Sequence, residues 1–344
     1  MNWICKTFIV LCCSTALVFS ASSFVVARSA RVSTVKTKVK VVKKRAAITQ
    51  KHRYHRVKAV PKAVAKPATG TLASRITARS AIIMDAVTGQ AIYAQASDAP
   101  AQPASTIKVL TGVISLDSLK KNELVPVSQR AAMMPRSKIY LRAGKKYPAN
   151  DLINAVLLAS ANDASVALAE KIAGSEQTFA KLMTAKAKSF GATNTVCKTA
   201  NGLTANGQYT TAHDLAKIFN SAMRNNDFAR KMSAIKVANT DGKIIRSHNR
   251  ALWQVAGAEG GKTGYTQVAR KTYVGKFKRN NDQIVVALMG SETMWEDVRA
   301  LVEYGFAKKR QTKVAEMTNM SSRDSRLFVQ LGNSPRQLPL ASAL

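Results

Sequence analysis

Apolar positions divide this chain into a strand-rich beginning, a helical middle and a strand-rich end. Two short β-forming runs, residues 80–85 and 91–95, flank a turn at Thr88-Gly89 and predict a hairpin. A second hairpin is predicted late in the chain, where two apolar runs flank Asn280-Asn281-Asp282. Strands are therefore expected near both ends of the folded segment.

Helical periodicity fills the region between the two hairpins. A helix is predicted over residues 105–120, with a buried stripe of Leu110, Val113, Ile114 and Leu116. Further helices are predicted at residues 151–159, 163–173 and 177–190, from Thr211 onward, and at 294–309. The order indicates an α/β (α+β) fold, in which an antiparallel sheet flanked by helices carries an inserted all-helical subdomain. A cleft between the sheet and the insertion is the expected site.

The first 27 residues have the features of an export signal. Lys6 precedes a 21-residue run of apolar or small uncharged residues that ends in Val25-Val26-Ala27. This arrangement is typical of a secretory signal peptide, residues 1–27, cleaved after Ala27. An uncleaved N-terminal membrane anchor is the alternative, because a run of this length can span a bilayer. Both interpretations place the rest of the chain in the periplasm or cell envelope.

The net charge of +34 is concentrated after this segment. Residues 28–70 contain fourteen Lys and Arg and no Asp or Glu, which predicts a disordered basic linker over 28–72. Residues 28–66 either contact an anionic envelope polymer or membrane surface, or serve as a solubilising spacer. Nucleic acid is not expected as a partner of an exported chain. We expect the folded domain to span 73–310 and a loosely ordered tail to span 311–344.

Cysteine and histidine usage argues against metal chemistry. Three of the four cysteines lie within the signal segment, which leaves Cys197 alone in the processed chain. None of the Cys and His spacings resembles a zinc site, and no metal or cofactor is expected. Cys197, His213 and His248 are interpreted as structural residues, and Trp295 as a packing residue.

A serine and a lysine in "PASTIKVL" lie one helical turn apart. Ser105 can act as a nucleophile only if a base removes its proton, and Lys108 can be that base only if it is neutral. The same spacing also begins at Ser33, Ser118 and Ser233, so the pair alone is a weak signal.

Two further motifs add candidate partners. Ser160 and Asn162, between two predicted helices, could relay a proton to a leaving amine and hold an amide carbonyl, or could simply cap the next helix. In "EGGKTGYT", Lys262 can bind an anionic group and keep Lys108 neutral by charge repulsion. Gly264 would let a substrate backbone lie close, although an ordinary glycine-rich turn is the alternative.

The order of the three motifs is more informative than any one of them. Ser160 follows Ser105 by 55 residues and Lys262 follows Ser160 by 102, which is the set found in penicillin-binding proteins and serine β-lactamases. From about residue 81 to 306 the chain resembles the low-molecular-mass penicillin-binding proteins that are D-alanyl-D-alanine carboxypeptidases. The matching stretches are "DAVTGQAIY", "PASTIKVLTG", "SANDASVALAEKIAGS", "GATNT", "NGLTANGQYTTAHDLAKI", "GGKTGYT" and "YGF".

The resemblance implies a β-lactamase/transpeptidase-like fold and a role for each motif residue. Ser105 would be the acylated nucleophile, Lys108 its base, and Ser160 and Asn162 their partners. Lys262, Thr263 and Thr266 would bind the substrate carboxylate, and the backbone N–H groups of Ser105 and Tyr265 would form an oxyanion hole. The implied substrates are peptidoglycan stem peptides, and the implied covalent inhibitors are β-lactam antibiotics.

Other functions remain as alternatives. A D,D-endopeptidase that cuts cross-linked peptidoglycan would use the same residues. A β-lactamase is disfavoured because neither Glu170 nor Glu176 lies in a Glu-x-x-Leu-Asn segment. A non-catalytic binder of anionic polymers would use residues 28–66.

The chain also departs from the family pattern at two places. Ala269-Arg270 replaces the usual Ala-Gly, and Met294-Trp295 stands where many members carry an arginine. The cation that assists Lys262 is therefore open among Arg246, Arg250 and Arg270.

Overall fold

The computed structural model describes residues 71–332. The predicted signal segment, nearly all of the basic linker and the last twelve residues of the predicted tail, 333–344, lie outside the described residues. None of the helices within 71–332 combines the length and the apolar composition needed to cross a bilayer.

A five-stranded antiparallel sheet in the order β2-β1-β9-β8-β7 joins the two ends of the folded chain. Both predicted hairpins are confirmed, β1 with β2 and β8 with β9, and β1 also pairs with β9. This order leaves β7 at an edge of the sheet. The strands are β1 (Ser80–Asp85), β2 (Ala91–Gln95), β7 (Ala258–Thr266), β8 (Arg270–Arg279) and β9 (Asp282–Ser291).

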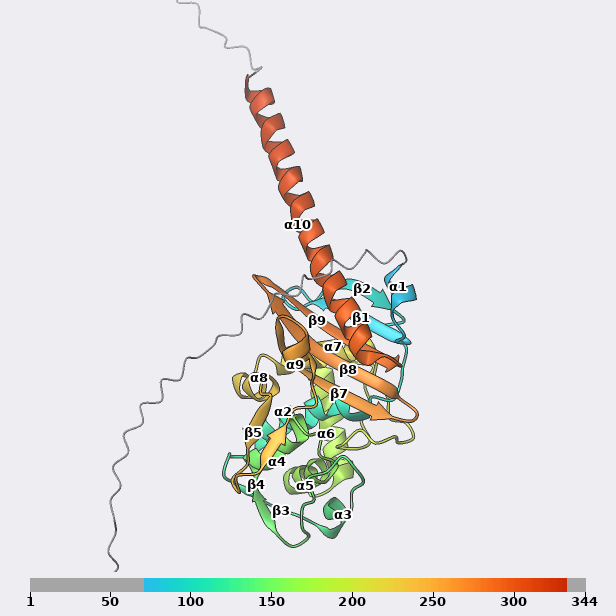
Figure 1. The fold of residues 1–344 in the computed structure, drawn as a ribbon, viewed down its shortest axis with the longest axis vertical. Helices are drawn as coiled ribbons and strands as arrows, with labels where there is room; N and C mark the ends of the chain where they lie inside the picture. Colours follow the sequence, from blue (N-terminus) through green and yellow to red (C-terminus); the bar gives the residue numbers. More distant parts are fainter. Residues whose placement is uncertain (1–70, 333–344) are drawn as a thin grey trace, which may run out of the picture. The chain divides into compact units, whose positions relative to one another are not determined.

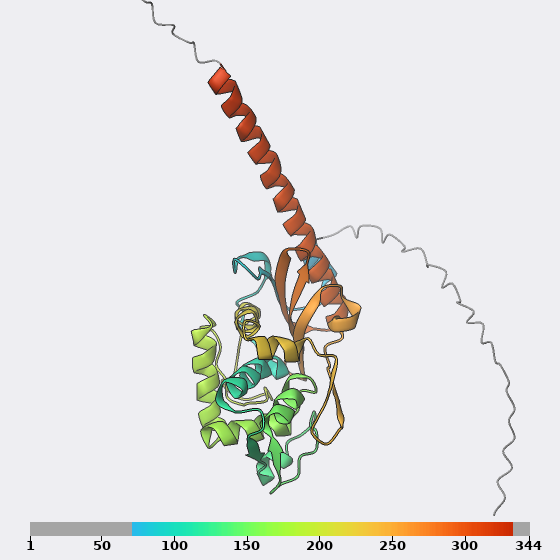
Figure 2. The same cartoon turned by 90° about the vertical axis from the view of Figure 1, so that its left-hand side faces the viewer.

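Both faces of the sheet are covered, as Figures 1 and 2 show, by α10 (Met294–Gly332) on one side and by helices that include α7 (Ala212–Ala222) on the other. Ile82 belongs to the core on the α7 side, whereas its neighbour Ile83 belongs to the core beneath α10. Because side chains alternate between two buried faces, the central strands read as continuous apolar runs.

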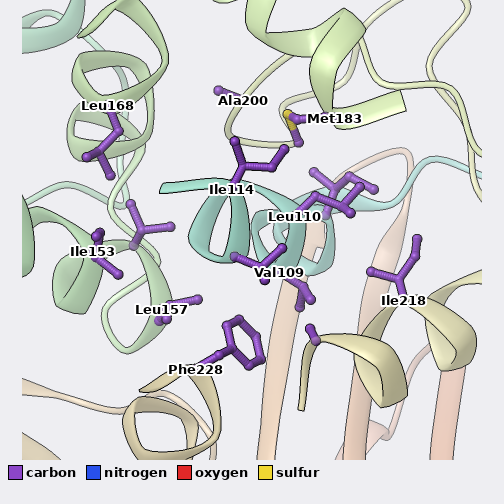
Figure 3. Packing of buried hydrophobic residues seen from close by; sticks show 14 of the residues in the cluster. Val109, Leu110, Ile114, Ile153, Leu157, Leu168, Met183, Ala200, Ile218 and Phe228 are labelled. Carbon is purple, nitrogen blue, oxygen red and sulfur yellow. The ribbon is translucent and has the colours of Figure 1, made fainter. Parts of the chain in front are cut away.

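Helix α2 (Lys108–Ser118) lies at the centre of the helical layer. The predicted stripe is confirmed for Leu110, Val113 and Ile114, whereas Leu116 is only half-buried. Every residue from 108 to 115 is buried, and Figure 3 shows side chains from several helices around α2. Its neighbours are α4 (Ala149–Leu157), α5 (Asn162–Ala173), α6 (Glu176–Ser189), α7 and α8 (Asn226–Met232). The first residue of α2, Lys108, is thus removed from water.

The inserted subdomain is not all-helical, which corrects the prediction. It also contains two short antiparallel ladders, β3 with β4 and β5 with β6. Each strand is three residues long, too short for an alternating pattern to be recognised in the sequence. These strands are β3 (Leu124–Pro126), β4 (Lys146–Pro148), β5 (Lys236–Ala238) and β6 (Ile244–Arg246), and the short helices are α1 (Leu72–Arg75), α3 (Gln129–Ala132) and α9 (Ala251–Gln254).

The last helix is longer than predicted. We expected it to end at residue 309 and a loose tail to follow, but α10 continues to Gly332. Residues 311–316 are all exposed, so no buried stripe marks this part of the helix in the sequence. No Gly or Pro occurs from Phe306 to Leu331, which leaves local propensity free to extend the helix.

A buried carboxylate ties the two ends of the folded chain together. Asp297 in α10 is fully buried and accepts hydrogen bonds from Thr77 N at 3.0 Å, Thr77 Oγ1 at 2.8 Å and Ser291 Oγ at 2.7 Å. These bonds connect the segment before β1 to the end of β9.

We predict that Asp297→Ala lowers the free energy of unfolding by about 2–4 kcal/mol, because the buried hydroxyl of Ser291 and two donors of Thr77 lose their acceptor. Urea denaturation measures this change. Glu296→Ala is the control: it removes an exposed neighbour paired with Arg299 and should cost below about 1 kcal/mol. Equal decreases in the free energy of unfolding of the two variants would contradict the proposal that Asp297 connects the two ends of the folded chain.

Candidate active site

Ser105 lies in η1 (Ala104–Ile107), a 3-10 turn that leads directly into α2. The turn is anchored from two directions, because the hydroxyls of Thr106 and Thr272 both donate to Pro103 O, at 2.5 and 3.0 Å. Ser105 is half-buried and faces a cavity of about 640 Å³. The serine is therefore rigidly held yet reachable.

Lys108 is fully buried beside this serine. Its Nζ lies 2.8 Å from Ser105 Oγ, 2.8 Å from Asn162 Oδ1 and 2.6 Å from Asn201 O. Burial holds the pKa of Lys108 well below its ordinary value, and the nearby charge of Lys262 lowers it further. The arrangement favours a neutral amine next to a hydroxyl.

Ser160 and Asn162 lie where α4 ends and α5 begins. Ser160 has a φ of +60°, a left-handed conformation that costs a serine about 1 kcal/mol. The backbone N–H of Asn162 donates to Ser137 O at 2.7 Å, and its Nδ2 donates to Pro135 O at 3.0 Å. Neither side chain caps α5, whose N-cap is Ala161 without a side-chain bond, so the capping interpretation is wrong.

Lys262 lies within edge strand β7, so the alternative of a glycine-rich turn is also wrong. Its Nζ donates to Ser160 Oγ at 2.8 Å and to Thr263 O at 3.0 Å. Burial lowers the pKa of Lys262 to about 7. The next four residues, Thr263, Gly264, Tyr265 and Thr266, line the same cavity as Ser105.

Two glycines let the backbone close around the serine. A Cβ at Gly264 would lie 2.8 Å from Ser105 N and 2.4 Å from Thr272 Oγ1. A Cβ at Gly202, whose φ is +78°, would lie 2.0 Å from Ala104 O. Only glycine permits these contacts, which bring β7 and the 199–203 segment against η1.

Sequence reasoning missed the contribution of the backbone at Asn201. Its carbonyl accepts from Lys108, and the preceding amide, Ala200 N, donates to Glu176 Oε1 at 3.0 Å. A carbonyl acceptor has no side-chain signature, so only the fold could reveal it.

Two residues assigned to structural or packing roles also line the cavity. His248 lies in its wall, and its pKa is lowered by partial burial and by the nearby charge of Lys262. Trp295 lines the cavity while packing edge-on against Tyr273, with ring centroids 5.7 Å apart.

The three candidate arginines lie in different surroundings, and only one of them lines the cavity of Ser105. Arg250 lines the cavity, and its guanidinium lies 5.8 Å from the centre of the Trp295 ring. Arg246 lines a neighbouring cavity instead, and Arg270 pairs with Glu292 at 3.7 Å.

Comparison with known proteins agrees with this geometry. A family model described as D-alanyl-D-alanine carboxypeptidase matches residues 63–293. The chain belongs to this carboxypeptidase family. D-alanyl-D-alanine carboxypeptidase DacB2 of Mycobacterium tuberculosis is 36% identical over 251 residues, which cover 70% of this chain and 86% of that protein. DacF of Bacillus subtilis is 30% identical over 276 residues, which cover 75% of this chain and 70% of that protein.

The fold of this carboxypeptidase-family enzyme is also similar to solved structures. A crystal structure of a D-alanyl-D-alanine carboxypeptidase from Mycobacterium tuberculosis matches with a TM-score of 0.65 and 34% identity, over 70% of this chain and 96% of that one. Penicillin-binding protein D2 of Listeria monocytogenes, in an ampicillin-bound form, matches with a TM-score of 0.62 and 25% identity, over 67% and 98%. The expected serine hydrolase family and transpeptidase-like fold are confirmed.

We predict that Gly264→Ala slows acylation by a β-lactam about 100-fold or more, because the added Cβ pushes β7 away from Ser105 N. Stopped-flow acylation measures the rate, and thermal unfolding tests whether the fold is retained. A folded variant that acylates at the normal rate would show that this close approach is not needed.

Proposed function

We propose that this enzyme removes the terminal D-alanine from peptidoglycan stem peptides through an acyl-enzyme on Ser105. One observation carries the proposal: a fully buried lysine amine lies 2.8 Å from the hydroxyl of Ser105. A neutral amine has two N–H donors and one lone pair. The oxygens of Asn162 and Asn201 accept the two donors, and the lone pair is left to receive the proton of Ser105.

In the first step Ser105 Oγ attacks the carbonyl carbon between two D-alanines while Lys108 takes its proton. The backbone N–H groups of Ser105 and Tyr265 stabilise the oxyanion, each contributing roughly 100- to 1000-fold in rate. Asn162 positions Lys108, because its Oδ1 and Nδ2 are both engaged within the protein.

In the second step the C–N bond breaks and the departing amine must gain a proton. Ser160, hydrogen-bonded to Lys262, relays that proton. Lys262, together with Thr263 and Thr266, binds the terminal carboxylate. Of the three candidate arginines we assign Arg250 as the assisting cation, because it alone of the three lines the cavity with Ser105 and Thr266. Water then hydrolyses the ester and restores Ser105.

A β-lactam presents a strained amide and a carboxylate to the same groups, so we propose covalent inhibition at Ser105. We further propose that residues 1–27 direct export to the periplasm or cell envelope, and that residues 28–66 contact an anionic envelope polymer or membrane surface. Both segments lie outside the described residues.

We predict that Ser105→Ala abolishes labelling by fluorescent penicillin and release of D-alanine from a stem pentapeptide. Ser118→Ala is a matched control, because Ser118 also precedes a lysine by three residues but lies exposed at the end of α2. This control should label normally. Labelling that persists in Ser105→Ala would refute the assignment of the nucleophile.

The lowered pKa of Lys262 predicts an alkaline limit. Below about pH 7 the amine carries the charge that binds the substrate carboxylate, and this interaction is lost as the pH rises through that value. We therefore expect kcat/KM to fall above about pH 7, since kcat/KM reports the free enzyme. A substrate ending in a carboxamide is the control and should show no such fall. A parallel fall with both substrates would contradict this role of Lys262.

A further inference from the structure

The active-site cavity contains an arginine whose side chain is not engaged by any residue that the structure describes. Arg136, Arg250 and Lys271 are exposed and line this cavity. The guanidinium of Arg250 lies over the ring of Trp295, and Lys271 Nζ donates a hydrogen bond to Glu292 O. The side chain of Arg136 forms neither an ion pair nor a hydrogen bond within the described part of the chain. Its charge is therefore available to a ligand in the cavity.

The backbone on both sides of Arg136 is held at the cavity wall. Asn162 Nδ2 donates to Pro135 O at 3.0 Å, and Asn162 N donates to Ser137 O at 2.7 Å. Arg136 thus lies between two residues that are hydrogen-bonded to the same side of the active site. An arginine on a fixed backbone loses less conformational freedom on binding than one on a mobile loop. The position of Arg136 is set by the fold before any ligand arrives.

The charges around Arg136 favour an anionic partner. Among the described residues that line the cavity, Glu296 is the one acid, and it pairs with Arg299 at 3.1 Å. A concave surface with an excess of one sign of charge raises the local concentration of ligands with the opposite charge. A planar guanidinium binds a carboxylate through two parallel hydrogen bonds. A carboxylate of the substrate is therefore the partner that fits Arg136.

Two sets of hydrogen bonds distinguish a leaving side and an acyl side on the insertion wall. In the proposed function the departing D-alanine is bound near Lys262, which donates to Ser160. The backbone around Arg136 is attached instead to Asn162, which accepts from Lys108 beside the acylated serine. We therefore place Arg136 on the acyl side, where the peptide that remains on the enzyme extends from the nucleophile.

We propose that Arg136 binds a side-chain carboxylate on the third residue of the stem peptide. This inference rests on the proposed function and narrows its substrate to stem peptides with a diamino dicarboxylic acid at that residue. The third residue is joined directly to the acyl D-alanine at a Cα spacing of about 3.8 Å, so its side chain lies at the cavity wall. A lysine at the same residue offers the side-chain amine without the carboxylate and leaves Arg136 unpaired. Arg136 thus determines specificity and takes no part in the bond-breaking steps.

This role differs from a structural one in its kinetic effect. The carboxylate lies outside the reacting atoms, so Arg136 binds it equally well in the ground state and in the transition state. Loss of such uniform binding raises KM and leaves kcat nearly unchanged. A structural role through Asn162 would instead displace Lys108 and slow acylation by every ligand, including a β-lactam.

The test compares three pentapeptides, L-Ala-γ-D-Glu-X-D-Ala-D-Ala, in which X is meso-diaminopimelate, its side-chain carboxamide or L-lysine. Arg136→Gln removes the charge, and Arg136→Lys keeps it. The control Arg142→Gln removes the same charge from an exposed position six residues further on, which lines the neighbouring cavity rather than that of Ser105. Released D-alanine gives kcat and KM. Acylation by benzylpenicillin, whose single carboxylate takes the place of the terminal one, reports the catalytic groups alone.

We expect the kcat/KM of the wild-type enzyme on the diaminopimelate peptide to exceed that on the other two peptides about fivefold to tenfold. Arg136→Gln should lose this preference through a higher KM, and Arg136→Lys should retain part of it. The control should keep the preference within about twofold. Acylation by benzylpenicillin should change by less than about twofold in every variant.

Three outcomes would overturn the inference. The wild-type enzyme could act equally well on all three peptides. Arg136→Gln could lose the same factor on all three, which would assign Arg136 to a group that they share, such as the terminal carboxylate. Arg136→Gln could also slow acylation by benzylpenicillin, which would show a structural role. A wild-type enzyme that is acylated by benzylpenicillin but releases D-alanine from none of the peptides would instead count against the proposed function itself.

Discussion

The active site depends on two lysine amines buried close together. Transfer of a charged ammonium from water into a protein interior costs several kcal/mol, and two such charges repel each other. Lys108 and Lys262 are both fully buried, and burial lowers both pKa values. Protonation of Lys262 therefore favours a neutral Lys108, which is the form that can accept a proton from Ser105.

The rest of the fold keeps these two amines apart and oriented. Lys108 begins a helix that is enclosed by other helices, and Lys262 lies on the edge strand of the sheet. Ser160 and Asn162 stand between them, each hydrogen-bonded to one lysine. The insertion thus forms one wall of the site and the sheet forms the other. Relative movement of the two layers would break the contact between Ser160 and Lys262.

The sheet and the insertion also supply different walls of the cavities around the catalytic residues. Arg250 and Trp295 stand at the wall of the cavity on the side of the sheet and its flanking helices, where a terminal carboxylate can be bound. A second cavity, of about 1010 Å³, belongs to the insertion, whose loop at 139–148 and hairpin at 239–246 are held by hydrogen bonds to Asp163 and Asp151.

The sequence by itself determined the hairpins, the buried stripe of α2, the family and the order of the three motifs, because periodicity and motif spacing are local or additive properties of a chain. Three-residue strands such as Lys236–Ala238 and the helical continuation past residue 309 left no such pattern. Tertiary structure alone decided which of the three candidate arginines lines the cavity and that a backbone carbonyl at Asn201 holds Lys108. It also decided that His248 joins two cavities, because these are contacts between segments far apart in the chain, and their distances depend on how the layers pack.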